Sequence, residues 1–121
     1  MKNIGSVKED LTTEKRISIT PETVKKFINL NFFVFLEKKY GEHLGIADDE
    51  YKNEGATLYS SSKEVLEKSQ IILKVNCPSN DEINSIKDKS ILIGQFDPLL
   101  DREILNKLIK KDINIFSLNL L

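Results

Sequence analysis

Residues 70–75 read Gln-Ile-Ile-Leu-Lys-Val, a short and almost continuous apolar run that contains one charged side chain, Lys74. Such a run is typical of a strand that is buried on both faces of a parallel sheet, because a strand with one wet face alternates apolar and polar residues. Four more segments of this kind flank it along the chain. The strands predicted in this way are about 3–7, 32–37, 70–75, 90–94 and 114–117.

Amphipathic segments separate these apolar runs. Thr20 followed by Pro21 is a typical helix start, because threonine caps the first turn and proline fits the first helical position. Five helices are predicted. The first begins at Pro21, the second covers about 48–54, and the third runs from the cap Ser61 to about 68. The fourth runs from Ser79 or Asn80 to about 88, and the fifth covers about 101–111. Strands that alternate with helices predict an α/β fold in three layers, a mostly parallel sheet of Rossmann or flavodoxin type with helices on both faces.

Length and composition narrow the class of protein. The 121 residues predict a single domain, 1–121, and a formal net charge of −1 provides no basic field for nucleic acid. The apolar runs are too short for direct membrane insertion, and the charged N-terminal region has no secretory signal, which indicates a cytoplasmic protein. One cysteine and one histidine cannot form a cluster of soft metal ligands, so no metal is expected.

The five glycines include no Gly-x-Gly pair, so the phosphate-binding loop of dinucleotide-binding folds is missing. We therefore expect no cofactor-binding residues in this chain and no cofactor bound to the chain alone. The sequence also contains no recognisable nucleophile with a base, and we assign no catalytic residue.

Ligands of open parallel sheets bind beyond the carboxyl ends of the strands, and the candidate site residues are those predicted at this edge. Arg16 follows the first strand in a charged stretch, 8–16, that is typical of a loop, Lys74 lies near the end of the third strand, and Gln95 and Asp97 follow the fourth. A buried ammonium needs an anion, which is either a protein carboxylate or a ligand carboxylate held jointly with Arg16. Residue type alone favours the protein carboxylate. Asp97 precedes Pro98, and a simple turn is the more ordinary explanation for it.

Five segments in this order resemble the N-terminal domain shared by alanine dehydrogenases and the alpha subunit of proton-translocating NAD(P) transhydrogenase. They are residues 4–9 (Ile-Gly-Ser-Val-Lys-Glu), 16–24 (Arg-Ile-Ser-Ile-Thr-Pro-Glu-Thr-Val), 51–56 (Tyr-Lys-Asn-Glu-Gly-Ala), 71–76 (Ile-Ile-Leu-Lys-Val-Asn) and 81–83 (Asp-Glu-Ile). The stretch 73–78 followed by 81–83 is more similar to the transhydrogenase version. Asp97 lies where alanine dehydrogenases usually carry a substrate-contacting histidine, and its charge would repel a pyruvate carboxylate.

The resemblance implies a role for two residues. Arg16 and Lys74 match the positions that hold the substrate carboxylate in the dehydrogenases, which reverses the preference from residue type and makes them the predicted substrate-binding residues. Gln95 and Asp97 are predicted to line the same cleft. In the complete enzyme the cofactors are NAD(H) and NADP(H), held by other domains, while a membrane segment moves protons.

The resemblance also implies partners. We expect an NAD-binding domain or the remaining transhydrogenase subunits, an oligomer, and a location peripheral to the inner membrane through those subunits. The chain resembles an N-terminal piece truncated before the NAD-binding domain, and we expect it to be inactive alone and to expose an apolar face. Two alternatives stay open: a fragment of an NAD-dependent alanine dehydrogenase, which catalyses oxidative deamination, and a non-catalytic interaction or remnant domain.

Overall fold

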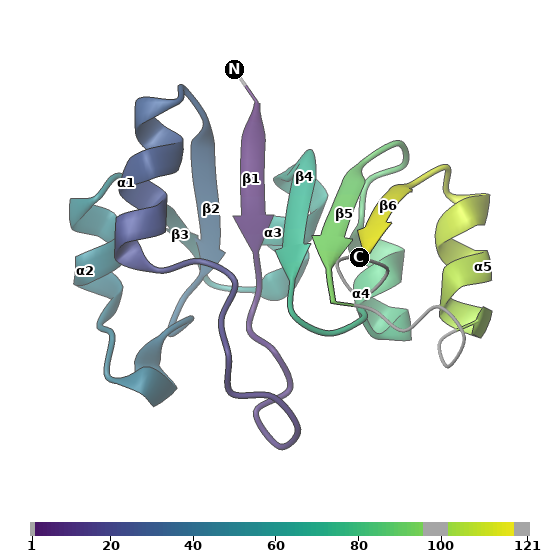
Figure 1. Ribbon diagram of the computed structural model, residues 1–121, viewed down its shortest axis with the longest axis horizontal. Helices are drawn as coiled ribbons and strands as arrows, with labels where there is room; N and C mark the ends of the chain where they lie inside the picture. Colours follow the sequence, from purple (N-terminus) through teal and green to yellow (C-terminus); the bar gives the residue numbers. More distant parts are fainter. Residues whose placement is uncertain (1, 96–101, 118–121) are drawn as a thin grey trace.

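The computed structural model describes residues 2–95 and 102–117, which form one six-stranded sheet flanked by helices (Figure 1). In chain order the elements are β1 (Asn3–Ser6), α1 (Pro21–Asn29), β2 (Phe33–Glu37), the 3-10 helix η1 (Glu42–Leu44), α2 (Asp48–Asn53), β3 (Thr57–Tyr59), α3 (Ser62–Lys68), β4 (Ile71–Lys74), α4 (Asn80–Ser85), β5 (Ile91–Gly94), α5 (Arg102–Lys110) and β6 (Asn114–Ser117). The strand order is β3-β2-β1-β4-β5-β6, and every pairing is parallel. The predicted α/β fold with a parallel sheet is confirmed.

Two apolar cores lie on opposite faces of the sheet, as expected for three layers. One face packs against α1 and α2, and its buried residues are Ile4, Ile19, Val24, Val34, Leu36, Tyr40, Tyr51 and Ala56. The other face packs against α3, α4 and α5, and its buried residues are Val7, Val65, Leu66, Ile72, Ile83, Ile86, Leu92, Leu108 and Ile113. Successive residues of a strand point to opposite faces, so β4 contributes Ile72 to one core while Leu73 packs against the other.

Local signals place the helix starts. The Thr20 hydroxyl accepts the amide N–H of Thr23 at 3.2 Å, and Pro21 occupies the first turn of α1, as predicted. Ser79, rather than Asn80, caps α4. Gly5 allows α3 to lie close to β1, because a Cβ atom there would come within 1.8 Å of the Ser69 hydroxyl oxygen.

Three local features differ from the prediction. The strand β3 and the 3-10 helix η1 were not predicted, because three residues are too few to show the repeat of apolar side chains that marks a strand or a helix. The helix α4 ends at Ser85 instead of about residue 88. It ends early because Ile86 turns to an extended conformation that buries its side chain, and the Lys111 ammonium binds the carbonyl oxygens of Ile83 and Ile86.

One apolar surface of the sheet stays open. The register places Leu73, Ile93 and Phe116 side by side on the face that carries α1 and α2. Those helices contact β2 and β3 and leave β6 uncovered within residues 2–95 and 102–117, where Phe116 is 57% exposed. The expected exposed apolar surface is therefore present. No helix in the described ranges is long and apolar enough to cross a bilayer.

Shortening a buried side chain and shortening an exposed one should change the free energy of unfolding by different amounts. Ile72 lies fully buried in β4, and Ile72→Ala should lower the free energy of unfolding by about 2–5 kcal/mol, because it leaves a cavity in a close-packed core. Phe116→Ala is the matched control in β6 and should change it by about 0.5 kcal/mol or less. Urea unfolding measures both values, and equal losses would contradict this placement of the core.

Candidate functional site

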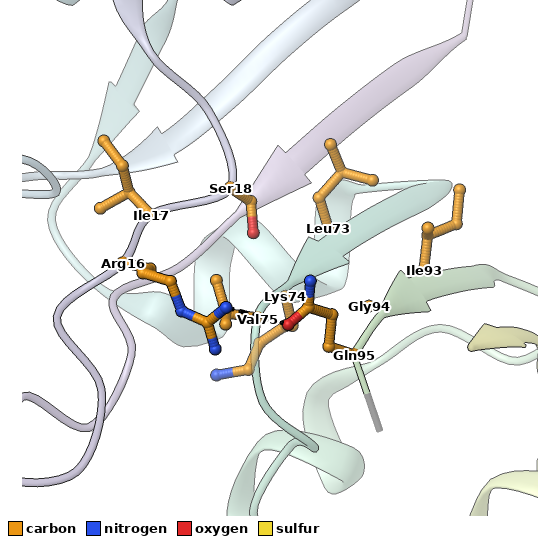
Figure 2. A pocket seen from close by; sticks show the side chains of 9 residues that line it. All are labelled: Arg16, Ile17, Ser18, Leu73, Lys74, Val75, Ile93, Gly94 and Gln95. Carbon is orange, nitrogen blue, oxygen red and sulfur yellow. Dashed lines mark hydrogen bonds between the residues drawn. The ribbon is translucent and has the colours of Figure 1, made fainter. Parts of the chain in front are cut away.

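A cavity of about 320 Å³ opens at the carboxyl ends of β4 and β5, beneath the loop that follows β1. Its lining residues are Arg16, Ile17, Ser18, Leu73, Lys74, Val75, Ile93, Gly94 and Gln95 (Figure 2). The strand order reverses between β1 and β4, so the cavity lies at the topological switch point where parallel α/β sheets bind ligands. The fold thus brings together three of the four predicted site residues, Arg16, Lys74 and Gln95. Asp97, the fourth, lies outside the described residues.

Arg16 extends across the cavity mouth from the loop after β1. Its Nε and Nη2 atoms donate to the two carboxylate oxygens of Glu14, each at 2.9 Å, and its Nη1 atom donates to the side-chain oxygen of Gln95 at 3.0 Å. Figure 2 shows the guanidinium and the Gln95 amide turned toward one another. The side chain is 62% exposed, so a ligand in the cavity can reach this cation.

Lys74 has the opposite environment. Its side chain is 4% exposed, and its ammonium lies 3.3 Å from a carboxylate oxygen of Glu9 and 3.5 Å from one of Glu82. The Glu9 carboxylate is itself buried and accepts the backbone N–H groups of Val75 and Asn76, at 3.0 and 3.1 Å. Protein carboxylates therefore balance the buried charge, which is the partner that residue type alone favoured.

The site holds two cations and three carboxylates. Hydrogen bonds from Arg16 lower the pKa of Glu14 to about 2, and the bonds to Glu14 raise the pKa of Arg16, with a smaller contribution from the charge of Glu9. Both charges of the Arg16–Glu14 pair persist across the physiological range. An anionic ligand must therefore bind to cations that already have carboxylate partners.

Sequence reasoning missed the carboxylates. Glu9 and Glu14 lie in the charged stretch 8–16, whose pattern predicts only a loop, and no role was predicted for Glu9 or Glu82, which appear only within the family motifs 4–9 and 81–83. The available signal was the buried cation at Lys74, which requires an anion but does not say which one. The loop position of Glu9, shortly after β1, was a second signal, because it places a carboxylate at the strand edge.

The Glu14 pKa predicts a pH dependence. A depressed folded-state pKa means that the ion pair contributes fully above pH 4.5, the ordinary value for this carboxyl, and is lost as the pH falls through about 2. A ¹³C NMR titration of the Glu14 carboxyl should show a midpoint of about 2. Arg16→Gln should move it toward 4.5, and Lys15→Gln, which leaves the pair intact, should not. An unmodified chain that titrates near 4.5 would disprove the pairing.

The buried pair predicts an effect on stability. Among residues 2–95 and 102–117, Glu9→Gln leaves Glu82 as the one ion-pair partner of the Lys74 ammonium. It should cost about 2–3 kcal/mol of unfolding free energy, because a buried charge loses its nearest partner. Glu67→Gln, which removes an exposed pair with Lys63, is the control and should cost about 0.5 kcal/mol or less.

The contribution of the unpaired ammonium can be checked separately. Adding Lys74→Met to Glu9→Gln should recover part of the loss in urea unfolding, because the uncompensated cation is then gone. Equal losses of unfolding free energy for Glu9→Gln and Glu67→Gln would show that the buried pair stabilises the fold no more than the exposed pair does.

The comparisons with known proteins point to the same family. The chain is 31% identical to an NAD(P) transhydrogenase subunit alpha polypeptide of Rhodospirillum rubrum, over 98% of this chain and 32% of that protein. It is 34% identical to alanine dehydrogenase of Methanococcus maripaludis, over 86% of this chain and 29% of that protein. The solved transhydrogenase of Sinorhizobium meliloti superposes with a TM-score of 0.92 at 28% identity, over 99% of this chain and 36% of that one.

The chain spans about a third of the length of these relatives. The model of the family described as alanine dehydrogenase/PNT, N-terminal domain, matches residues 5–121. This match covers nearly the whole chain and agrees with the parallel sheet and with the relatives of both kinds. The protein therefore belongs to the alanine dehydrogenase/PNT N-terminal domain family.

Proposed function

We propose that this chain is the N-terminal portion of the alpha subunit of a proton-translocating NAD(P) transhydrogenase. In the complete enzyme, hydride passes between NAD(H) and NADP(H) while protons cross the membrane. The observation that carries the proposal is the relationship to the Rhodospirillum rubrum alpha subunit, which extends over 98% of this chain. The high structural similarity to a solved transhydrogenase supports it.

Within that enzyme the chain contributes a cavity wall that holds an anionic group. Arg16 is the principal anchor, because its guanidinium is exposed at the cavity mouth and can bind a carboxylate or phosphate oxygen in a planar, charge-assisted geometry. Lys74 supplies a second positive charge at the floor, which the carboxylates of Glu9 and Glu82 balance. Gln95 orients Arg16 through the 3.0 Å hydrogen bond, and Asp97 is proposed as a further cleft residue.

The described residues do not fit a dinucleotide cofactor. The strand order matches that of dinucleotide-binding folds, in which the pyrophosphate lies at the start of the helix after β1. Here the first turn of α1 suits a pyrophosphate poorly, because Pro21 has no N–H group, the Thr20 hydroxyl already accepts the N–H of Thr23, and Glu22 adds a negative charge. We therefore assign cofactor binding to the partners, which are an NAD-binding domain or the remaining transhydrogenase subunits, and we expect the chain alone to be inactive.

These partners imply a place in the cell and an assembly. The chain itself is expected in the cytoplasm, attached to the inner membrane only through the other subunits. The open apolar surface around Phe116 supports association into an oligomer, because exposed apolar side chains gain from burial against a partner.

A second candidate is a portion of an alanine dehydrogenase. The convergence of Arg16 and Lys74 on one cavity favours it, since a 2-oxo acid carboxylate fits two cations. The 34% identity to the alanine dehydrogenase of Methanococcus maripaludis also supports it. The charge of Asp97 argues against it, because a second carboxylate would repel pyruvate.

Reconstitution tests the proposed function. The full chain should co-purify with the polypeptides that supply the rest of the enzyme, and the assembly should transfer hydride from NADH to NADP⁺. The same assembly without this chain should be inactive. Full activity in its absence would refute the proposal, and turnover of pyruvate with ammonia instead would favour the dehydrogenase.

The anion site predicts a ligand effect that needs no partner. Oxalate, a small dicarboxylate probe, should bind the chain in an NMR titration, and Arg16→Gln should weaken it by about tenfold, as expected for the loss of a charge-assisted bond. Arg102→Gln is the matched control, because Arg102 is an exposed arginine outside the cavity lining. Equal effects of the two substitutions would refute the role of Arg16. Binding of NADH at micromolar concentration by the chain alone would refute the assignment of cofactor binding to partners.

A further inference from the structure

A buried tyrosine hydroxyl links the two walls of the cavity. Tyr40 lies in the turn after β2 and is 1% exposed. Its hydroxyl oxygen accepts the backbone N–H groups of Ser18 and Ile19, at 3.0 and 3.2 Å, and lies 2.8 Å from the hydroxyl oxygen of Ser6. The Ser6 hydroxyl is 2.7 Å from the carbonyl oxygen of Leu73. Since a carbonyl only accepts, Ser6 donates to Leu73, and Tyr40 therefore donates to Ser6.

This chain of hydrogen bonds connects the backbone segments that carry the two cations. Ser18 is two residues beyond Arg16 in the loop after β1, and Leu73 directly precedes Lys74 in β4. Ser18 and Leu73 both line the cavity, on the sides from which Arg16 and Lys74 reach it (Figure 2). The Tyr40 hydroxyl thus fixes the loop against the sheet next to the site.

The Leu73 carbonyl sets the direction of the two bonds from Tyr40 to Ser6 and from Ser6 to Leu73, here called the relay, because it can only accept. Burial raises the pKa of Tyr40 further above its ordinary value of 10.0, so the hydroxyl is protonated at neutral pH and can donate to Ser6. Both hydroxyls of the relay, those of Tyr40 and Ser6, belong to buried residues, and the bonds from the loop are backbone amides. Replacing one hydroxyl therefore leaves buried polar groups without their partner and loosens the loop.

A second tyrosine provides a natural comparison. Tyr51, on α2, is fully buried, packs edge-to-face on Tyr40 with ring centroids 5.7 Å apart, and donates to the carbonyl oxygen of Ile19 at 2.9 Å. Gly41 makes room for it, because a Cβ atom there would be 3.0 Å from the Tyr51 hydroxyl oxygen. Tyr51 therefore holds the same loop as Tyr40, but its bond joins that loop to α2 rather than to the strand of Lys74.

We propose that Tyr40, acting with Ser6, is a positioning residue for the anion-binding cavity, because it holds the loop of Arg16 at a set distance from the strand of Lys74. This inference rests on the proposed anion-binding role of Arg16. A ligand that contacts both walls binds more tightly when the walls are held in place before it arrives, since less ordering is needed on binding. Neither Tyr40 nor Ser6 is among the residues that line the cavity, so they act through the backbone.

The test compares oxalate affinity in matched variants of the full chain. Tyr40→Phe keeps the ring and removes the hydroxyl, and it should weaken oxalate binding by about five- to tenfold, the loss expected for one buried hydrogen-bond link. Tyr51→Phe removes a hydroxyl from the same loop and should change the affinity by less than about twofold. Urea unfolding of both variants shows whether their stability losses are similar. Ser6→Ala breaks the relay at its other hydroxyl and should reproduce the loss of affinity.

A double-mutant cycle separates positioning from general destabilisation. In an Arg16→Gln background, Tyr40→Phe should no longer change oxalate affinity, because the group that it positions is gone. The same loss with and without Arg16, or equal losses for Tyr40→Phe and Tyr51→Phe, would overturn the inference.

The outcomes also distinguish this inference from the proposed function. Oxalate binding that depends on Arg16 but not on Tyr40 or Ser6 overturns the positioning role alone. Oxalate binding that is absent, or that is unchanged by Arg16→Gln, overturns the anion site and the positioning role with it.

Discussion

The buried pair between Lys74 and Glu9 is the interaction on which the carboxyl edge of the sheet depends. A buried ammonium is stable only with an anion at hand, and Glu9 lies 3.3 Å away with its oxygens also held by the amides of Val75 and Asn76. The loop after β1 is thereby attached to the end of β4. The cavity exists because this attachment and the Tyr40 relay hold the loop over the strand ends.

Compensated cations make the site selective rather than strongly attractive. Arg16 is held by Glu14 and Gln95, so a ligand must offer more than charge to displace or join these partners. A planar carboxylate or a phosphate oxygen that also contacts the apolar wall at Leu73 and Ile93 meets this requirement. Under the proposed function, this group would lie beside a cofactor that another domain holds.

The strand order of this domain is that of dinucleotide-binding proteins, yet its residues at the start of α1 do not suit a pyrophosphate. Fold and chemistry are separable, since a parallel sheet provides a crevice at its switch point while the loops decide what enters it. In this chain the loop between β1 and α1 carries Arg16 and Glu9 instead of glycines. Membership of the alanine dehydrogenase/PNT N-terminal domain family is consistent with the proposal that another domain binds the cofactor.

Local patterns in the sequence determined most of the secondary structure and the edge at which the site lies. The apolar run 70–75, the cap at Thr20 and the position of Arg16 after β1 are visible without coordinates, because they depend on neighbours within a few residues. Only the tertiary structure decided that Glu9 and Glu82 meet Lys74, that Gln95 holds Arg16, and that Tyr40 joins the loop of Arg16 to the strand of Lys74. Those contacts link segments up to 79 residues apart, as Arg16 and Gln95 are, and their distances follow from strand order and loop path rather than from any local period.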